Sequence, residues 1–528
     1  MKKLLTIILL LNSGCLSSTY FVATNGNDSN PGTINQPWAT WQKAFITAIA
    51  GDTVYFRGGV YQTAAIVQGN QSGTKSKPIC YLNYPGEMPI LDGTNKTSGS
   101  HGLHIANQKY LHIKGLIIRN NRQILENDDP SGFVLSNCNQ ITLENCTSHN
   151  NGKRGFYVLE PDTVTIINCD SYNNADILQS AIAGNGGDGF LINDDGSDDD
   201  TLSYVTINGC RSWHNSDDGF DLGSEGYVKT YNCWSWNNGF LERGNGAGFK
   251  FGLKDVFVKA LPTRRITNCV AAYNKYHGFT TNDNNCESQL MQIFNNTAFR
   301  NGVNPNRECD AYGFFIFKAD LGDESENLKR IFKNNLSYGN YTGEVIAELS
   351  TWYTHEYNSW DNTPNLIITD ADFISIDSTG ISGPRHADGS LPDLNGFLRL
   401  SSTSKAIDAG VNVGLPFYNN APDLGAYEYD PQSGTNMHPS VVISSPSTGS
   451  TFTAPANITI TANASDADGS ITKVEFFIGA TKLGEKTSAP YSVVWNNVTA
   501  GTYSLTAIAT DNLNAKTTSS AISISVTY

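Results

Sequence analysis

The sequence predicts an all-β protein: a right-handed parallel β-helix with an N-terminal capping helix, followed by a small immunoglobulin-like β-sandwich. Three observations predict this fold class. Charged residues are only 16% of the 528, glycine is abundant at 49, and short β-branched runs alternate with asparagine-rich turns. A Gly-Phe pair also recurs at spacings of 23 to 35 residues, which is typical of a solenoid of short strands. The pairs lie at 132–133, 155–156, 189–190, 219–220, 248–249, 278–279 and 313–314.

Six cysteines form a second repeat beside these pairs, five of them in the pattern Asn/Gly-Cys-x-x-x-x-Asn. Coils of a β-helix stack about 4.8 Å apart, so equivalent residues form columns along the axis. We expect the cysteines to be small buried hydrophobic residues in such a column, and the asparagines to form hydrogen-bonded ladders in the turns. The sequence contains no CxxC pair, the pattern that would indicate a zinc site. The six are Cys138, Cys146, Cys169, Cys210, Cys233 and Cys269.

The N-terminus, MKKLLTIILLLNSGC, has a basic start and an apolar run too short to span a bilayer. We interpret residues 1–18 as a secretory signal of a bacterial protein. Cys15 follows small residues, as at a lipoprotein processing site, and cleavage nearby by the ordinary signal peptidase is the alternative. The sequence therefore predicts a protein that is either secreted or anchored at the cell surface as a lipoprotein.

The predicted β-helix domain covers residues 19–430. Its segment WATWQKAFITAIA, residues 38–50, is amphipathic and predicts a helix that caps the open end of the solenoid. KAIDAG and DLGAYEY, at 405–410 and 423–429, resemble a closing segment. Residues 431–439 then read as a linker, and 440–528 as an immunoglobulin-like β-sandwich because alternating runs are separated by regular turn signals.

The formal net charge of −15 argues against a nucleic-acid partner, because phosphates would be repelled. A polyanionic substrate would need a cation to mediate its contact with so acidic a chain. We expect the chain to act as a monomer.

Alignment of the Gly-Phe pairs brings several charged residues together. If each Phe points inward, the next residue points outward, which gives the column Leu191, Asp221, Lys250, Thr280. A bend at the preceding glycine would add Asp188, Asp217 and Asp218 to the same outer patch. Four carboxylates with hard oxygen donors favour a Ca²⁺ site. An acidic surface without metal, with Lys250 as a salt-bridge partner of Asp221, is the alternative.

The blocks SDDGFD, NCWSWNNG and GNGAGFKFG, residues 216–221, 232–239 and 244–252, resemble the core signature of family 9 polysaccharide lyases. The resemblance extends loosely over residues 19–430. It implies that Asp188, Asp217, Asp218 and Asp221 are calcium ligands and that Lys250 is the Brønsted base.

The function that follows is calcium-dependent β-elimination in galacturonate-containing pectin chains, leaving a 4,5-unsaturated uronate. The expected partner is an acidic plant cell-wall polysaccharide: pectin, polygalacturonate or rhamnogalacturonan. Arg243 and Lys275 are candidate substrate contacts. A rhamnogalacturonan lyase with the same machinery, a glycoside hydrolase using two carboxylates, and a non-catalytic glycan-binding surface protein are the alternatives.

Overall fold

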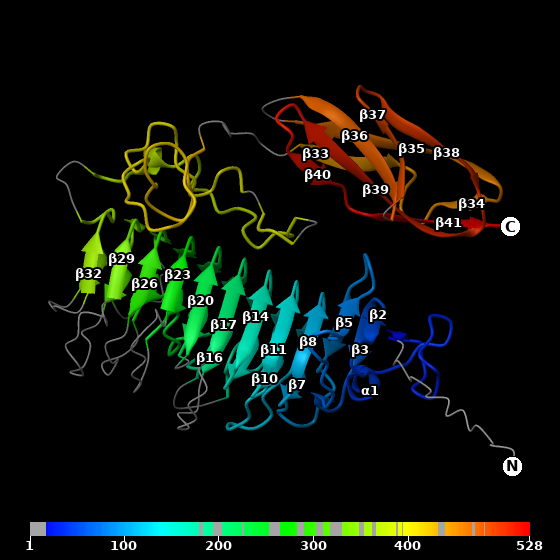
Figure 1. Cartoon of the computed structure of the whole chain (residues 1–528), viewed down its shortest axis with the longest axis horizontal. Helices are drawn as coiled ribbons and strands as arrows, with labels where there is room; N and C mark the ends of the chain where they lie inside the picture. The colour runs from blue at the N-terminus through cyan, green and yellow to red at the C-terminus, as the bar shows by residue number, and fades with distance from the viewer. Residues whose placement is uncertain are drawn as a thin grey trace, which may run out of the picture.

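The computed structural model describes residues 17–178, 183–193, 203–223, 226–252, 264–281, 290–302, 310–316, 330–347, 353–361, 366–386, 389–392, 394–430, 439–466, 470–479 and 481–528. Successive coils of the chain stack on one another and form three long parallel sheets (Figure 1). A small, mainly antiparallel β domain follows at the C-terminal end. The predicted parallel β-helix is therefore confirmed.

The first sheet has twelve strands. They are, in spatial order, β1 (Thr19–Val22), β2 (Thr53–Phe56), β5 (Ile79–Asn83), β8 (Lys109–Lys114), β11 (Asn139–Glu144), β14 (Thr163–Ile167), β17 (Tyr204–Asn208), β20 (Tyr227–Tyr231), β23 (Arg264–Thr267), β26 (Met291–Phe294), β29 (Arg330–Lys333) and β32 (Tyr353–Glu356).

A second sheet of ten strands, here called the site sheet, carries the Gly-Phe pairs. Its strands are β4 (Val67–Gly69), β7 (Leu103–Ala106), β10 (Phe133–Ser136), β13 (Phe156–Leu159), β16 (Phe190–Asn193), β19 (Phe220–Leu222), β22 (Phe249–Lys250), β25 (Phe279–Thr280), β28 (Tyr312–Ile316) and β31 (Gly343–Ala347).

The third sheet also has ten strands. They are β3 (Gly59–Gln62), β6 (Pro89–Asp92), β9 (Ile117–Arg119), β12 (Thr147–His149), β15 (Asp170–Tyr172), β18 (Arg211–Trp213), β21 (Trp234–Trp236), β24 (Val270–Ala272), β27 (Thr297–Phe299) and β30 (Leu336–Tyr338).

The phenylalanines of the Gly-Phe pairs form one continuous stack inside the β-helix. Their strands pair in the register that the sequence alignment predicts, Phe opposite Phe from Phe133 to Phe314. Neighbouring ring centroids lie 4.7–5.0 Å apart with planes within 8° of parallel. This spacing equals the distance between strands in a sheet, so backbone pairing and ring stacking are satisfied together.

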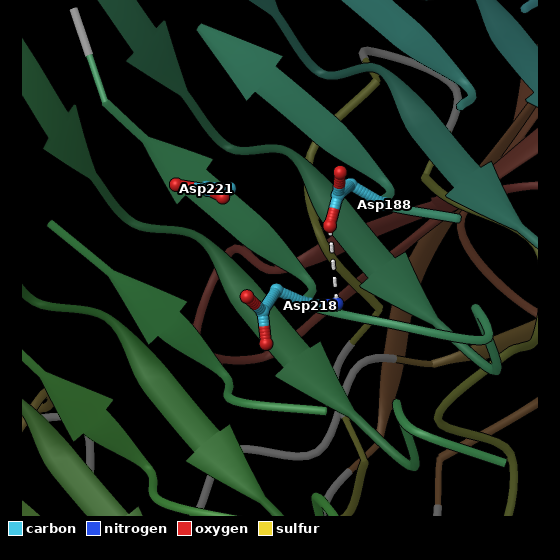
Figure 2. Close-up of side chains that lie close together, drawn as sticks. All are labelled: Asp188, Asp218 and Asp221. Carbon is cyan, nitrogen blue, oxygen red and sulfur yellow. Dashed lines mark hydrogen bonds between the residues drawn. The ribbon is translucent and has the colours of Figure 1, made fainter. Parts of the chain in front are cut away.

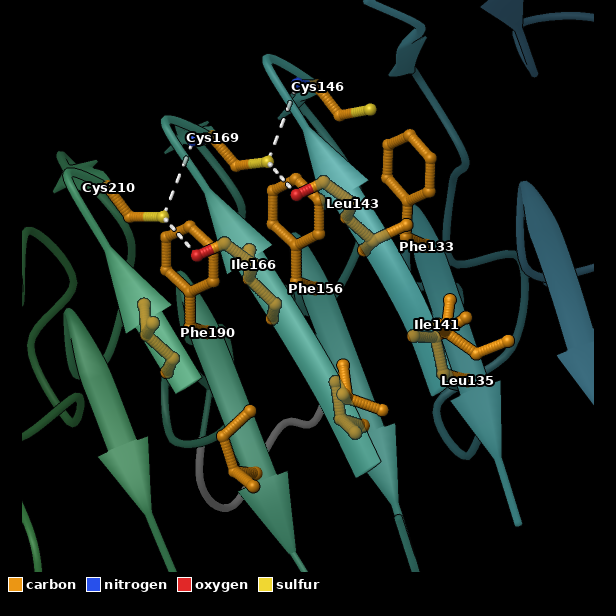
Figure 3. Packing of buried hydrophobic residues seen from close by; sticks show 14 of the residues in the cluster. Phe133, Leu135, Ile141, Leu143, Cys146, Phe156, Ile166, Cys169, Phe190 and Cys210 are labelled. Atoms are coloured by element: carbon orange, nitrogen blue, oxygen red, sulfur yellow. Dashed lines mark hydrogen bonds between the residues drawn. The ribbon is translucent and has the colours of Figure 1, made fainter. Parts of the chain in front are cut away.

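The cysteines and asparagines form further columns. All six repeat cysteines are buried with free thiols, as predicted, and the Cys146 amide donates to the Cys169 sulfur in the next coil (Figure 3). Buried asparagines each donate a side-chain amide to the next coil's carbonyl oxygen, for example Asn215 to Asn238 at 3.0 Å. The asparagine ladder satisfies polar groups that the tight turns would otherwise leave unpaired.

The N-terminal cap is shorter than predicted. Helix α1 spans Trp41–Thr47, not 38–50, because the Thr40 side chain accepts the amide of Lys43 and so caps the first turn. Trp41, Ala44 and Phe45 are buried, and the Phe45 ring stacks 4.0 Å from that of Tyr81. The helix therefore covers the apolar end of the core.

Residues 366–430 pack against the third sheet, with one 3₁₀ turn at Asp370–Asp372. Phe373, Phe397 and Leu424 share an apolar cluster with Trp236, and Arg385 binds Asp170 at 2.6 Å. The described residues of this segment thus bury one outer face of the β-helix.

The C-terminal domain is an all-β unit with its own apolar core. Of the predicted linker 431–439, only Pro439 is among the described residues. Residues 1–16, which include Cys15, all lie outside the described residues. One sheet contains β33 (Ser440–Ser445), β35 (Ala456–Ser465) and β38 (Tyr491–Val498). The other contains β34 (Thr451–Thr453), β36 (Ile471–Ile478), β37 (Thr481–Lys486), β39 (Gly501–Asp511), β40 (Lys516–Thr518) and β41 (Ile522–Thr527).

In the part of the chain that the structure describes, no helix has the length and apolarity needed to cross a membrane.

Candidate active site

The site lies where consecutive coils enter the site sheet. Asp188 immediately precedes the Gly189-Phe190 pair, and Asp218 precedes Gly219-Phe220. Glycine is required at 219, because a Cβ there would lie 2.0 Å from the Ser235 hydroxyl oxygen. This close packing fixes the chain just before each strand and so sets the position of the preceding aspartate.

The outward column has the predicted register. Leu191 pairs with Asp221, Asp221 with Lys250, and Lys250 with Thr280 in neighbouring strands. Side chains alternate along a strand, so the residue after each buried Phe faces outward. Asp221 and Lys250 keep 18% and 16% of their side-chain surface exposed, while Phe220 and Phe249 are fully buried. Leu191 and Thr280, in the same column, are buried as well.

Three carboxylates and one amine converge in this patch. Asp188, Asp218 and Asp221 each offer an oxygen within 4.8 Å of the others (Figure 2). The Asp218 amide donates to the Asp188 carboxylate at 3.2 Å. Lys250 Nζ lies 3.3 Å from Asp221 Oδ2 and 3.5 Å from Asp218 Oδ2. The three acids and the lysine that the sequence predicted as one cluster are therefore adjacent.

Asp217 lies outside this trio of carboxylates. Its Oδ1 accepts the amide of Asn245 at 2.7 Å, and the residue is buried. The chain bends at Asp217, just before β19, and only the Asp218 carboxylate comes within 4.8 Å of both Asp188 and Asp221. The sequence predicted a quartet, and the structure forms a trio with Asp217 beside it.

Burial makes the negative charges of this cluster unfavourable. Desolvation, followed by the charges of Asp221 and Asp218, raises the pKa of Asp188 to about 7. Desolvation also raises the pKa of Asp218 to about 6, against the opposing effect of Lys250. The pKa of Lys250 is in turn raised, mainly by Asp221. One lysine does not neutralise the cluster.

The residues present fit a bound divalent cation. Asp218 Oδ2 is buried without a hydrogen-bond partner, which is a costly state for a carboxylate oxygen. The donors are hard carboxylate oxygens from two successive coils, the ligand type that Ca²⁺ prefers. The donor atoms of the cluster therefore suit a calcium ion.

The two predicted substrate contacts differ in their surroundings. Arg243 is exposed on the loop 241–244. The Lys275 ammonium is buried and donates to the carbonyl oxygens of Leu241, Glu242 and Gly244 at 2.6–2.9 Å. These bonds use all three of its donors. Lys275 thus holds the loop that carries Arg243, and contact of either residue with substrate stays a prediction.

Arg154 is a neighbour of the site that the sequence analysis missed. Its Nε lies 3.8 Å from Asp188 Oδ2. It precedes the Gly155-Phe156 pair, as Asp188 and Asp218 precede theirs. Extending the Gly-Phe alignment by one coil toward the N-terminus would have placed it in the same column.

Known proteins resemble this chain in sequence and in fold. A family model described as "Pel9A-like, right handed beta helix region" matches residues 20–327, and one for a bacterial Ig domain matches residues 439–507. Pectate lyase L of Dickeya chrysanthemi is 30% identical over 429 residues, 78% of this chain and 90% of that protein. Pectate lyase PEL9 of Emericella nidulans is 28% identical over 443 residues, 75% of this chain and 96% of that protein.

Two solved structures share the fold. The crystal structure of pectate lyase Pel9A gives a TM-score of 0.61 at 27% identity, covering 79% of this chain and 98% of that one. A rhamnogalacturonan lyase gives 0.60 at 26% identity, covering 73% and 97%. The β-helix is thus right-handed, and the protein is a polysaccharide lyase. Within that class, the chain belongs to the Pel9A-like β-helix family.

Proposed function

We propose that this protein cleaves galacturonate-containing pectin chains by calcium-dependent β-elimination, with Lys250 as the Brønsted base. The observation that carries the proposal is the Lys250 amine, 3.3 Å from Asp221 at the edge of a buried carboxylate cluster. The pectate lyase relatives support the substrate class. A hydrolase would need a carboxylate pair acting as acid and base, with no role for an adjacent amine.

Asp188, Asp218 and Asp221, with Asp217 beside them, would hold the ion. A bound Ca²⁺ supplies positive charge that stabilises the negative charge developing on the substrate carboxylate during C5 deprotonation. Lys250 takes the C5 proton, and the C–H electron pair forms the C4–C5 double bond. The C4–O bond breaks as this double bond forms, and its electron pair leaves with the glycosidic oxygen, which solvent protonates.

Lys250 accepts a proton only as the neutral amine. The unneutralised carboxylates raise its pKa, so turnover requires that their charge be balanced and that the pH be alkaline. A positioned general base accounts for about a 100- to 10,000-fold rate effect. Activity should consequently rise with pH as the lysine loses its proton.

The test follows ultraviolet absorbance of the unsaturated product on polygalacturonate, with and without chelator. Lys250→Ala should lose activity by about 100-fold or more. Lys229→Ala, an exposed lysine of β20, is the matched control and should behave as wild type. Undiminished absorbance from Lys250→Ala would remove Lys250 from the mechanism, and undiminished activity in chelator would remove calcium.

A second candidate is a rhamnogalacturonan lyase, favoured by the solved structure of that name at 26% identity. The eliminated unit is again a galacturonate, so the same residues would serve. Parallel assays on rhamnogalacturonan and polygalacturonate separate the two, since the preferred polymer gives the faster rise in absorbance.

We also propose that the chain is exported through a signal within residues 1–18, and that cleavage before Cys15 leaves this cysteine as the lipidated residue. Growth with radiolabelled palmitate should label the wild type but not Cys15→Ser. Equal labelling of both proteins would exclude Cys15 as the lipid site.

A further inference from the structure

Arg154 stands on the coil next to the acidic cluster, on the N-terminal side. Strand β13 pairs with β16, and the Gly155 amide donates to the Asp188 carbonyl oxygen at 3.0 Å. Arg154 therefore occupies the position in its coil that Asp188 and Asp218 occupy in the next two. It is a cation at the end of a column of carboxylates.

The guanidinium is held on one side. Nη1 donates to both carboxylate oxygens of Asp129 at 2.7 and 2.8 Å. The group also lies over the Tyr157 ring, 4.6 Å from its centroid, a cation–π contact. Asp129 is shared with Lys153, whose amine is 3.9 Å away, so one carboxylate serves two cations.

The other donors of Arg154 are not used by the described residues. Nε is buried without a hydrogen-bond partner, and 3.8 Å separates it from Asp188. Nη2 has no hydrogen bond to the described residues either, and unlike Nε it is not among the buried atoms that lack a partner. The side chain is 13% exposed, so a ligand on the face of the site sheet reaches Nη2 while Nε stays enclosed.

We propose that Arg154 binds a second uronate carboxylate of the polymer, through Nη2, on the N-terminal side of the reacting sugar. This inference rests on the proposed function. Coils repeat about every 4.8 Å, so Arg154 is about 10 Å along the axis from the coil of Asp221. A polymer lying along the column therefore meets Arg154 beyond the unit that faces Lys250.

The chemistry selects a carboxylate. Arginine donors match planar carboxylates better than neutral hydroxyls, and the bond is charge-assisted. The contact is remote from the reacting atoms and is made equally in the ground and transition states. It therefore lowers KM and leaves kcat largely unchanged.

The test measures kcat and KM for oligogalacturonates of increasing length at saturating calcium. For wild type, KM should fall sharply once the chain is long enough to reach Arg154. Arg154→Gln should abolish this fall, raising KM for long chains by about 10- to 100-fold, the range for a hydrogen bond to a charged group. Short chains and kcat should be unaffected.

Two variants accompany it. Arg154→Lys keeps the pairing with Asp129 and should give an intermediate KM, which guards against misfolding of Arg154→Gln. Arg119→Gln removes a salt-bridged arginine of β9, paired with Asp92 at 2.8 Å on the third sheet, and should leave the length dependence unchanged.

The outcomes separate three cases. The inference would be overturned if Arg154→Gln raised KM equally for all chain lengths. It would also be overturned if the variant needed more calcium but kept the wild-type length dependence. Either result would make Arg154 a positioning residue for Asp188. Absence of wild-type turnover would instead contradict the proposed function. In that case binding can still be measured by calorimetric titration of a long oligogalacturonate into Lys250→Ala and into the double variant Lys250→Ala/Arg154→Gln. Equal affinities of the two proteins would overturn the proposed contact with Arg154.

Discussion

Replacing Asp218 by Asn should stabilise the metal-free protein at neutral pH and above. Burial raises the pKa of Asp218 from 3.8 to about 6. Between these values the folded protein retains a proton that the unfolded chain has lost, so stability falls as pH rises through this window. The shift of about 2 units corresponds to about 3 kcal/mol at 1.36 kcal/mol per unit. Asn has the same shape and no charge, and it avoids this cost.

The assay is differential scanning calorimetry in chelator at pH 4 and pH 8. For a β-helix domain of about 400 residues, 3 kcal/mol corresponds to a rise in Tm of about 3 °C. The rise should appear at pH 8 and largely vanish at pH 4, where wild-type Asp218 is protonated. Saturating calcium should reverse the order, because a ligand stabilises only the protein that binds it. A lower Tm for Asp218→Asn in chelator at pH 8 would refute the reasoning.

Three further variants test the fold around the site. Asn238→Ala breaks the buried ladder and leaves polar partners in two coils unpaired, so it should lower the free energy of unfolding by about 3 kcal/mol; Asn70→Ala, at an exposed asparagine outside the ladder, should change it little, and equal Tm values for the two would argue against the ladder. Phe220→Ala should cost about 3–5 kcal/mol in a calorimetric scan, since its ring stacks on both sides; a cost below 1 kcal/mol would contradict this. Lys275→Met releases three carbonyl oxygens of the loop, so trypsin should cut after Arg243 faster than in wild type, and an unchanged rate would show that the loop is held by other contacts.

The sequence repeats predicted most of the fold. The recurring Gly-Phe pair was enough to pair Phe220 with Phe249 and, one residue later, Asp221 with Lys250. The reason is geometric: strands of a parallel solenoid stack in register, so identical residues in successive coils mark identical positions. The cysteine column followed from the same argument.

Local backbone geometry was harder to read. Asp217 and Asp218 are neighbours in the chain, and only the bend before Gly219 decides which of them joins Asp188. The ends of α1 likewise depend on the cap at Thr40 and on the chain direction after Thr47, neither of which is a property of the apolar pattern.

Lys275 and Arg154 show that the roles of basic residues near the site could not be predicted from the sequence alone. Both are basic residues near the site, and the sequence pointed to Lys275 as a substrate contact without singling out Arg154. In the folded chain the Lys275 amine is enclosed by three carbonyl oxygens, whereas Arg154 keeps an unused donor next to Asp188. The difference arises because the loop 241–244 folds over one cation and not over the other.

The sequence by itself determined the coil register, the buried columns and the identity of the acids and the amine on the outer face. These follow from periodicity, which the chain carries in its own spacing. Tertiary structure decided which carboxylates touch, how strongly burial shifts their pKa values, and which cations remain available to a ligand. Those properties depend on distances and solvent access between loops of unequal length, and the repeat places no constraint on them.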